Sequence, residues 1–485
     1  MYTELAVFII YFVFMLGIGI YFFFKSKGSG EKDYFLGGRN MGAWVSALSA
    51  GASDMSAWVL MGLPASVYAA GMGQTWIAIG LGLGYAASWL LEAPRLRRFS
   101  IAAKDSITIP QYLTNRFLSK SHILQLLCAV IFLVAYTVYA ASSIKACGTL
   151  FHTVMGINEK TAMYIGAFII VAYTFLGGFS AVCWTDFFQG LLMLGALLIA
   201  PILALICMKT GSAGTAAVLP DGYFNFMTSW KDIISGLGWG LGYFGMPHII
   251  IRFMSLRSEK ELKKSSAIGI SWTSIILIMS VLSGVVGRMF FNGEIADTST
   301  VFITMVRRIF PPLLSGILLS AILSAAMSTA DSQLLASASA FASDVYKPLI
   351  HKKASDREML WMSRIVVLVI AVVALLIASS PNSGTIMGLV ENAWGVFGAA
   401  FGPVIMLSLF WKRLNFAGAA AGIIGGAAAD VLWLVFMSST GVYEIVPGVV
   451  VSIICAVSTS LLTKAPGEDV IALFEKASKP ESRQE

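Results

Sequence analysis

The sequence predicts an all-α integral membrane protein with about thirteen spanning helices, and three observations carry this prediction. First, 57% of the 485 residues are hydrophobic and 12% are charged, which is about half the charged fraction of a soluble domain. Second, the mean hydropathy is +0.80, so the chain cannot cover itself with a polar surface. Third, apolar stretches of about 20 residues, the length that a spanning helix needs, recur along the chain.

The expected spans follow from these stretches in chain order. They cover approximately 5–24, 43–70, 74–92, 122–150, 160–180, 184–208, 230–250, 266–290, 312–343, 359–379, 385–410, 414–438 and 443–463. None of the polar segments between them has the length of a separate soluble domain. We therefore predict one transmembrane domain at 1–464, followed by a short cytoplasmic tail at 465–485.

Basic residues gather in every second loop between the expected spans. If the N-terminus is placed outside, the inner loops hold most of them, among them Arg39, Arg97, Arg116 and Arg252. Cytoplasmic loops of membrane proteins carry an excess of Lys and Arg. The net charge of +7 therefore indicates membrane orientation rather than nucleic-acid binding. The pattern predicts an outer N-terminus and a cytoplasmic C-terminus.

Two of the expected spans are unlike ordinary membrane helices. Segment 43–70 is rich in serine and glycine, and segment 230–250 has glycine at 236, 238, 240, 242 and 245. Backbone leaves helical geometry at membrane depth only where protein or a watery cavity satisfies it. The two segments are five spans apart, which suits two inverted five-helix repeats, at about 43–208 and 230–410. In secondary transporters that are built from inverted repeats, paired broken helices hold the substrate and the ion.

Asp54 stands deep in the first of these segments, within SAGASDMS. A charge at the centre of a membrane helix costs about 2.5–3.5 kcal/mol, so it is rarely found there without a partner. A sodium ion, or a path for one, would compensate the carboxylate. The structural alternative is that Asp54 caps a broken helix.

The ninth expected span carries a polar stripe. Ser320, Ser324, Ser328 and Ser332 recur every four residues and share one face of a helix, with Thr329 and Asp331 beside it. Hydroxyl and carbonyl oxygens suit a hard cation. Small residues that let membrane helices pack closely give the same pattern. Taken with Asp54, the stripe favours an ion site.

Trp239, Tyr243 and Pro247 follow one another at four-residue spacing in the seventh span and share a face. A Trp and a Tyr beside a broken helix could wall a small solute, and Tyr139 is a weaker candidate of the same kind. Aromatic residues also gather at membrane interfaces. The neighbouring glycines favour a cavity or tight packing over contact with lipid.

Several classes of protein find no support in the sequence. It has no P-loop, HExxH or GxSxG motif and no nucleophile–base constellation, so we expect no enzyme. The five cysteines form no CxxC pair, which argues against a disulfide framework or a metal centre. We expect no nucleic-acid partner and no obligate protein partner.

Several long motifs resemble the sodium:solute symporter family. They are FLGGR at 35–39, ALSAGASDMSAWVLMGLP at 47–64, GGFSAVCWTDFFQG at 177–190, WGLGYFGMPHI at 239–249, LLSAILSAAMST at 318–329 and FGAAFGP at 397–403. The likeness runs from about Tyr34 to about Pro466. It implies a LeuT-like inverted-repeat fold, alternating access, Na+ as the coupling ion and the bacterial plasma membrane as the location.

The resemblance also implies roles for individual residues at the ion site. The main sodium site would be formed by Ala52, Met55, Ala325, Ser328 and Thr329. Asp54 would serve sodium binding, and Asp186 would lie near a cytoplasmic sodium exit or a second ion position.

A second group would contact the transported solute, for which L-proline is the first candidate. This group consists of Tyr139, Trp239, Tyr243 and Pro247, with Ser56 beside them. Arg39 would match a basic residue tied to coupling. We assign Asp331, Lys145 and Glu391 to coupling or gating as well.

Three residues depart from the pattern expected for proline transporters: Met246, Lys145 and Glu391. Buried Lys and Glu side chains must be paired or neutral. We therefore hypothesise that Lys145 and Glu391 pair in the outer vestibule, so that removing either one impairs transport and removing both partly restores it. Separate snorkelling of the two side chains to the outer interface is the alternative.

The sequence thus predicts Na+-coupled symport of a small solute into the cell. Proton coupling through Lys145 or Asp54 is a rival mechanism. Another amino acid, a monocarboxylate or a sugar acid are rival substrates. From a different class, a membrane sensor or a channel would also be a multi-pass protein, although no signalling domain is appended.

Overall fold

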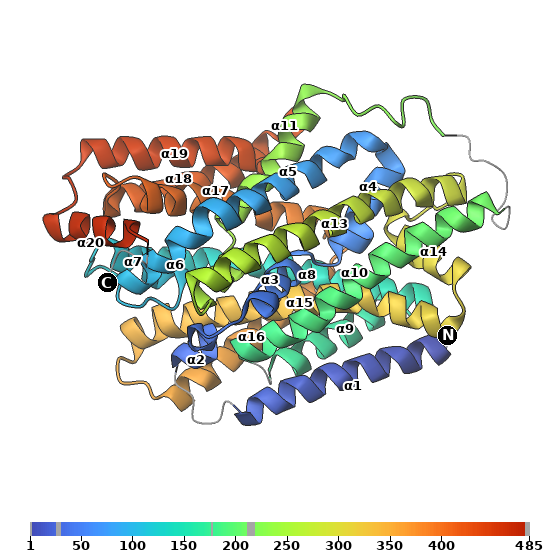
Figure 1. Ribbon diagram of the computed structural model, residues 1–485, viewed down its shortest axis with the longest axis horizontal. Coiled ribbons are helices and arrows are strands. Elements are labelled where there is room, and N and C mark those ends of the chain that lie inside the picture. Colours follow the sequence, from blue (N-terminus) through green and yellow to red (C-terminus); the bar gives the residue numbers. More distant parts are fainter. Residues whose placement is uncertain (1, 26–30, 176–177, 211–218, 481–485) are drawn as a thin grey trace.

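The computed structural model describes residues 2–25, 31–175, 178–210 and 219–480, and within these ranges the chain is helical. The only strand-like pairing there is an isolated bridge between Met41 and Leu256. The long helices run in roughly one direction, and α2, α6, α7 and α20 lie with the C-terminus at the end opposite the N-terminus (Figure 1). The prediction of an all-α protein is confirmed.

Ten stretches of helix in the described residues are long and apolar enough to cross a membrane. They are formed by α1 (Tyr2–Lys25), α5 with η4 and α6 (Thr75–Ala87, Ser88–Glu92 and Ala93–Ala102), α8 (Ile123–Met155), α10 (Phe179–Lys209), α13 (Glu259–Phe291), α15 with η7 (Pro312–Phe341 and Ala342–Ile350), α16 (Asp356–Ala378), α17 (Ile386–Phe410), α18 (Phe416–Phe436) and α19 (Ile445–Leu462). The chain is therefore a multi-pass membrane protein.

Burial separates the central helices from the peripheral ones. In the apolar stretch of α15 and η7, 83% is buried inside the protein, whereas in that of α1 the buried share is 22%. The serine- and alanine-rich α15 consequently lies in the middle of the bundle, and α1 lies on its rim. Polar residues in α15 must therefore find partners within the protein rather than in water.

Local sequence explains where several of these helices begin. The side chains of Ser258, Thr385 and Asn415 each accept a hydrogen bond from the backbone amide three residues further on, at the starts of α13, α17 and α18. Such caps satisfy one of the amides that an α-helix leaves unpaired in its first turn.

Shorter elements connect the long helices: α2 (Glu31–Leu36), η1 (Gly37–Arg39), η3 (Met72–Gln74), α7 (Ile109–Arg116), α9 (Glu159–Thr174), η6 (Thr298–Thr300), α14 (Val301–Ile309), η8 (Ser438–Thr440) and α20 (Glu468–Ser478).

The predicted interruption of segment 43–70 is confirmed. Helix α3 (Ala43–Asp54) ends at Met55, whose ψ of 71° is not helical. The Ser56 amide then donates to the Asp54 carbonyl at 2.8 Å. The chain continues as η2 (Trp58–Gly62) and α4 (Leu63–Ala70). The break follows a run of small residues, where no bulky side chain enforces helical packing.

Segment 230–250 is interrupted as well. It consists of α11 (Trp230–Gly238), the 3-10 turn η5 (Trp239–Phe244) and α12 (Pro247–Ser255). Its glycines permit close backbone contact with α5: a Cβ on Gly240 would lie 2.2 Å from the Gly80 carbonyl oxygen. The glycine pattern therefore reports tight helix packing beside the break.

Four arginines assigned to inner loops by the charge pattern are buried: Arg39, Arg97, Arg116 and Arg252 are 9%, 5%, 0% and 1% exposed. Three of them satisfy carbonyls near helix C-termini. Arg39 donates to the Met254 carbonyl at 2.6 Å, Arg97 to that of Leu256 at 3.0 Å and Arg116 to that of Ser408 at 3.1 Å. Burial of these inner-loop arginines follows from this, because three of their guanidinium groups bond carbonyls at helix ends.

The described part of the tail forms a docked helix. The Phe474 ring of α20 lies 5.4 Å from Phe99 of α6 and 4.9 Å from the Arg116 guanidinium. Arg95 also donates to the Ser478 hydroxyl at 3.0 Å. Helix α20 therefore covers α6 and α7 (Figure 1).

Candidate functional site

The break in α3 meets α15 at a cluster of oxygen atoms. The Ser328 hydroxyl lies 2.7 Å from the Ala52 carbonyl and 3.3 Å from the Ala325 carbonyl. Thr329 follows Ser328 in the chain, Met55 is three residues after Ala52, and both are fully buried. The Thr329 hydroxyl has no hydrogen-bond partner among the described residues. The structure thus brings together three of the five residues proposed to bind sodium, with the other two beside them in the chain.

Carbonyl and hydroxyl oxygens are the donors that a hard cation prefers. The carbonyl of Ala52 lies in the last turn of α3, where helix carbonyls lose their intrahelical partners. An interrupted helix therefore supplies acceptors that an uninterrupted one would not. The donor set at Ala52, Ala325 and Ser328 fits Na+ chemically.

Asp54 links the two interrupted segments. Its Oδ2 accepts a hydrogen bond from the Tyr243 hydroxyl at 2.5 Å, and its Oδ1 has no partner among the described residues. Its backbone carbonyl accepts from the Trp58 indole at 3.2 Å. The carboxylate is completely buried. Asp54 is the last residue of α3, and within the described part of the chain its side chain makes no cap hydrogen bond there; its role in ion binding stays a prediction.

Trp239 and Tyr243 lie in a buried aromatic cluster. The Tyr243 ring makes edge contacts with Tyr85 and Trp394, each with ring centroids 5.1 Å apart. Trp394 donates its indole N–H to the Trp239 carbonyl at 2.8 Å, and the Trp239 ring lies 5.1 Å from Tyr443. The sequence prediction missed Tyr85, Trp394 and Tyr443, because their spans carry no local sign of a break.

Three other proposed solute-site residues lie near the two breaks. Ser56 is buried within the α3 break, and Pro247 begins α12. The Tyr139 ring of α8 contacts His248 edge-on at 6.4 Å, and its hydroxyl has no hydrogen-bond partner among the described residues. Met246, which departs from the expected pattern, is the buried residue that caps α12.

A buried ion pair joins α10 and α12. Asp186 of α10 accepts hydrogen bonds from the Ser49 hydroxyl at 2.7 Å and from the Arg252 guanidinium at 3.1 Å. The same Arg252 nitrogen donates to Ser332 at 2.6 Å. The side chains of the pair are 2% and 0% exposed. The network ties together α3, α10, α12 and α15.

Sequence reasoning missed Arg252 and counted it as a loop residue. Its apolar neighbours Ile251 and Phe253 were the available signal, since a lone charge between them would be expected to need a buried partner. Asp331 lies beside the network, with its Oδ1 at 3.4 Å from the Ser332 hydroxyl. The structure therefore groups Asp186 and Asp331 near one arginine rather than at the break of α3.

Arg39 anchors a second polar network at the same end of the bundle. Its φ is +55°, and its guanidinium donates to the Asp105 carboxylate at 2.8 Å. Lys32 pairs with the other oxygen of Asp105. Partial burial raises the pKa of the Asp105 carboxyl, but the two cations outweigh burial and hold the pKa below its usual value. Arg39 thus joins η1, the turn between α6 and α7, and the end of α12.

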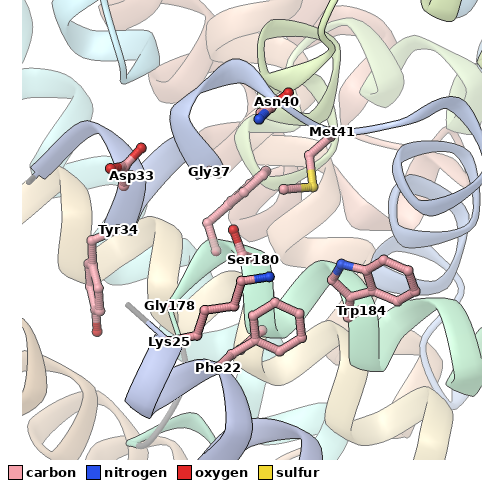
Figure 2. Close-up of a pocket in the computed structure, with 12 residues that line it drawn as sticks. Phe22, Lys25, Asp33, Tyr34, Gly37, Asn40, Met41, Gly178, Ser180 and Trp184 are labelled. Atoms are coloured by element: carbon pink, nitrogen blue, oxygen red, sulfur yellow. The ribbon is translucent and has the colours of Figure 1, made fainter. Parts of the chain in front are cut away.

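A surface cavity opens beside this network (Figure 2). It has a volume of about 310 Å³ and lies between the end of α1, the α2–η1 corner and the start of α10. Lys25, Asp33 and Trp184 are among the residues around it. None of the proposed ion or solute residues lines it, so this cavity is separate from the site at the helix breaks.

The lowered pKa of Asp105 leads to a prediction for stability. A carboxylate with a depressed pKa in the folded state stabilises it above about pH 4, and this contribution is lost as the pH falls through the folded-state pKa. Because the side chain is 43% exposed, we expect Asp105→Asn to cost no more than about 1 kcal/mol. Thermal unfolding should show a lower midpoint for the variant at neutral pH and a narrowing gap in acid. Asp221→Asn, at an exposed position, is the matched control. An equal gap at both pH values would contradict the assignment.

Lys145 and Glu391 are not paired. Lys145 donates to the Ser383 hydroxyl at 2.9 Å and to the Gly384 carbonyl, in the loop between α16 and α17. Glu391 lies within α17, and its carbonyl accepts from the Tyr443 hydroxyl at 2.9 Å. No ion pair joins the two side chains in the described ranges, so the proposed pair is wrong for this conformation. The lysine reaches a loop, whereas the glutamate faces the start of α19.

Comparison with known proteins gives consistent results. The sodium:solute symporter family profile matches residues 34–426. The high-affinity proline transporter PutP of Bacillus subtilis is 44% identical over 469 residues, covering 95% of this chain and 98% of the relative. The osmoregulated proline transporter OpuE of the same organism is 44% identical over 475 residues, covering 96% of each. A sodium/proline symporter of Staphylococcus aureus is 42% identical over 476 residues, covering 94% of this chain and 92% of that protein.

Solved structures show the same fold. A Na+-coupled sialic acid symporter in a substrate-bound outward-open state superposes with a TM-score of 0.80 at 22% identity, covering 96% of this chain and 99% of that one. A nucleobase-cation-symport-1 family transporter in a closed conformation gives a TM-score of 0.53 at 14% identity, covering 91% and 97%. At these identities the likeness concerns the fold, which is the LeuT-like fold that the sequence predicted.

Proposed function

Because this chain belongs to the sodium:solute symporter family, we propose that it carries L-proline into the cell together with Na+. The observation that carries the proposal is the convergence of the Ala52 and Ala325 carbonyls on the Ser328 hydroxyl at the break of α3. The identity to two proline transporters across nearly the whole chain supports proline as the substrate.

In this proposal the ion and the solute occupy adjoining places. Na+ is held by Ala52, Met55, Ala325, Ser328 and Thr329, with Asp54 next to them. Proline is held by the solute group, which consists of Tyr139, Trp239, Tyr243, Pro247 and Ser56. The hydrogen bond between Asp54 and Tyr243 joins the two groups directly. An ion that fixes the end of α3 therefore also orients a wall of the solute site.

Coupling follows from this shared geometry. Each ligand favours the conformation in which α3 and η5 are held together, so each raises the affinity for the other by the same factor. The membrane potential favours inward movement of the sodium charge by about 2.3 kcal/mol per 100 mV. Transport then requires the two repeats to rock and open the site to the inside.

The proposal includes the membrane arrangement. The ten long spans, the shorter α9 and the two interrupted segments make thirteen crossings, with inverted repeats at 43–208 and 230–410. The N-terminus lies outside, and the C-terminus with α20 lies in the cytoplasm of a bacterial cell. The positions of the N- and C-termini at opposite ends of the bundle (Figure 1) support an odd number of crossings.

The direct test is uptake of labelled proline by the purified protein in proteoliposomes. We expect saturable uptake that requires an inward Na+ gradient and is not supported by a K+ or proton gradient. An excess of unlabelled proline should inhibit the uptake of labelled proline, whereas a monocarboxylate or a sugar acid should not. Sodium-dependent uptake of one of those solutes in place of proline would overturn the substrate assignment. Uptake driven by a proton gradient alone would overturn the coupling ion.

A further inference from the structure

Three carboxylates gather where α17, α18 and α19 approach the outer side in the proposed orientation. They belong to Glu391 in α17, Asp430 in α18 and Glu444 at the start of α19. Asp430 is completely buried, and neither of its carboxylate oxygens has a hydrogen-bond partner among the described residues. Glu444 is 6% exposed, and its Oε1 also has no partner there.

Two glycines, which lack a side chain, lie next to these carboxylates. A Cβ on Gly395 would lie 2.7 Å from Asp430 Oδ1 and 3.3 Å from Glu444 Cγ, so both side chains face the same point of α17. A Cβ on Gly448 would lie 3.3 Å from the Asp430 Cβ. The buried Asp430 carboxylate is thus directed toward Gly395, beside the Glu444 side chain. Figure 1 shows α18 and α19 running side by side here.

No described Lys, Arg or His forms an ion pair with these carboxylates. Within the described ranges, no ion pair includes Glu391, Asp430 or Glu444. The titratable groups that face Asp430 from the packed elements are Glu391 of α17, and Tyr443 and Glu444 at the entry to α19. The Tyr443 hydroxyl already donates to the Glu391 carbonyl. An isolated ionised carboxylate in a low-dielectric interior is strongly unfavourable, so a cation must neutralise it.

The surroundings bear on which cation is bound. The described part of the chain contains no group of three or more acidic, His or Cys side chains arranged to hold a metal ion, which argues against a carboxylate-bound Ca2+ or Mg2+. Here the Asp430 carboxylate lies against Gly395 of α17, and the Glu444 side chain lies against the same glycine. A proton needs a single oxygen. We propose that Asp430 and Glu444 form a proton-binding site, with the partly exposed Glu391 on the route from the outer water.

The site adjoins the solute group. Trp394, the residue before Gly395, donates to the Trp239 carbonyl, and the Tyr443 ring lies against Trp239. Loss of the proton leaves two negative charges side by side against Gly395, and their repulsion separates α18 from the start of α19. Trp239 then loses the contact with the Tyr443 ring at the start of α19. Resting on the proposed function, this predicts that the KM for proline rises with external pH while the kcat changes less.

The first test needs no transport. Infrared difference spectra of the purified protein, titrated between about pH 6 and about pH 8.5, should contain the carbonyl band of a protonated carboxylic acid. The band should disappear in Asp430→Asn and shift in Glu444→Gln, but not in Asp221→Asn. A band unchanged in Asp430→Asn would overturn the site. Its loss on adding Na+ at constant pH would show that a metal ion, not a proton, is the ligand.

The second test measures uptake over the same pH range. Asp430→Asn, which mimics the protonated form, should retain uptake and give a proline KM that is independent of pH. The wild-type protein and Asp221→Asn should show the rise. A folded Asp430→Asn variant with the wild-type pH profile would overturn the inference. Failure of proline uptake in the wild-type protein would instead count against the proposed substrate and leave the infrared result standing.

Discussion

Arg252→Ala abolishes transport and lowers the free energy of unfolding by about 3–5 kcal/mol, the cost of breaking a buried ion pair by removing one partner. The reason is that Asp186 remains behind, completely buried, with the Ser49 hydroxyl as its remaining hydrogen-bond donor among the described residues. The same change removes the hydrogen bond that Arg252 of α12 donates to Ser332 of α15. Thermal unfolding in detergent and proline uptake measure the two effects.

Two further variants separate charge from packing. Arg252→Gln combined with Asp186→Asn removes both charges and keeps the polar contacts, so its stability should recover most of the loss. Arg257→Ala removes an exposed arginine just beyond the same helix and should leave stability within about 0.5 kcal/mol of the wild type. If the double variant is as unstable as Arg252→Ala, the ion pair is not the cause.

The pair also has a position suited to gating. In the proposed orientation it lies between the solute site and the cytoplasm, and it connects elements from both proposed repeats. Opening toward the inside would have to separate these elements. The neutral double variant, if stable, should therefore transport with altered rates rather than altered sodium affinity.

Ser328→Ala raises the Na+ concentration for half-maximal uptake by about tenfold to a hundredfold. The variant removes the hydroxyl on which the Ala52 and Ala325 carbonyls converge. Loss of one oxygen donor to a charged ligand is worth about 1.5–3 kcal/mol, and each 1.4 kcal/mol is a factor of about ten. Proline uptake measured against Na+ concentration gives the shift.

The serine stripe supplies its own control. Ser320 lies two turns earlier on the same face, but its hydroxyl donates to the Gly316 carbonyl of its own helix at 2.8 Å. Ser320→Ala should therefore leave sodium activation unchanged. Equal activation curves for Ser320→Ala and Ser328→Ala would remove Ser328 from the ion site and return the stripe to a packing role.

The stripe illustrates how far a sequence pattern reaches. The four-residue spacing predicted that all four serines lie on one helix face, and all four are buried. Their partners differ: Ser320 bonds within its helix, Ser324 contacts Tyr11 of α1, Ser328 meets the break of α3 and Ser332 accepts from Arg252. Periodicity identifies a face, but the neighbours of that face come from distant parts of the chain.

Local composition by itself determined the membrane class, the all-α fold and the two interrupted segments of this protein. Those features depend on burial in lipid and on the conformational freedom of small residues, which are properties of about twenty consecutive residues. The motifs added the family and the residues at the α3 break.

Only the tertiary structure decided which charges meet. It paired Arg252 with Asp186, 66 residues away, separated Lys145 from Glu391 and placed Asp430 beside Glu444 over Gly395. A charged residue in a membrane helix needs a compensating group, and the sequence reveals which residues have this need. Which group supplies the compensation depends on helix rotation and neighbour order, which long-range packing sets.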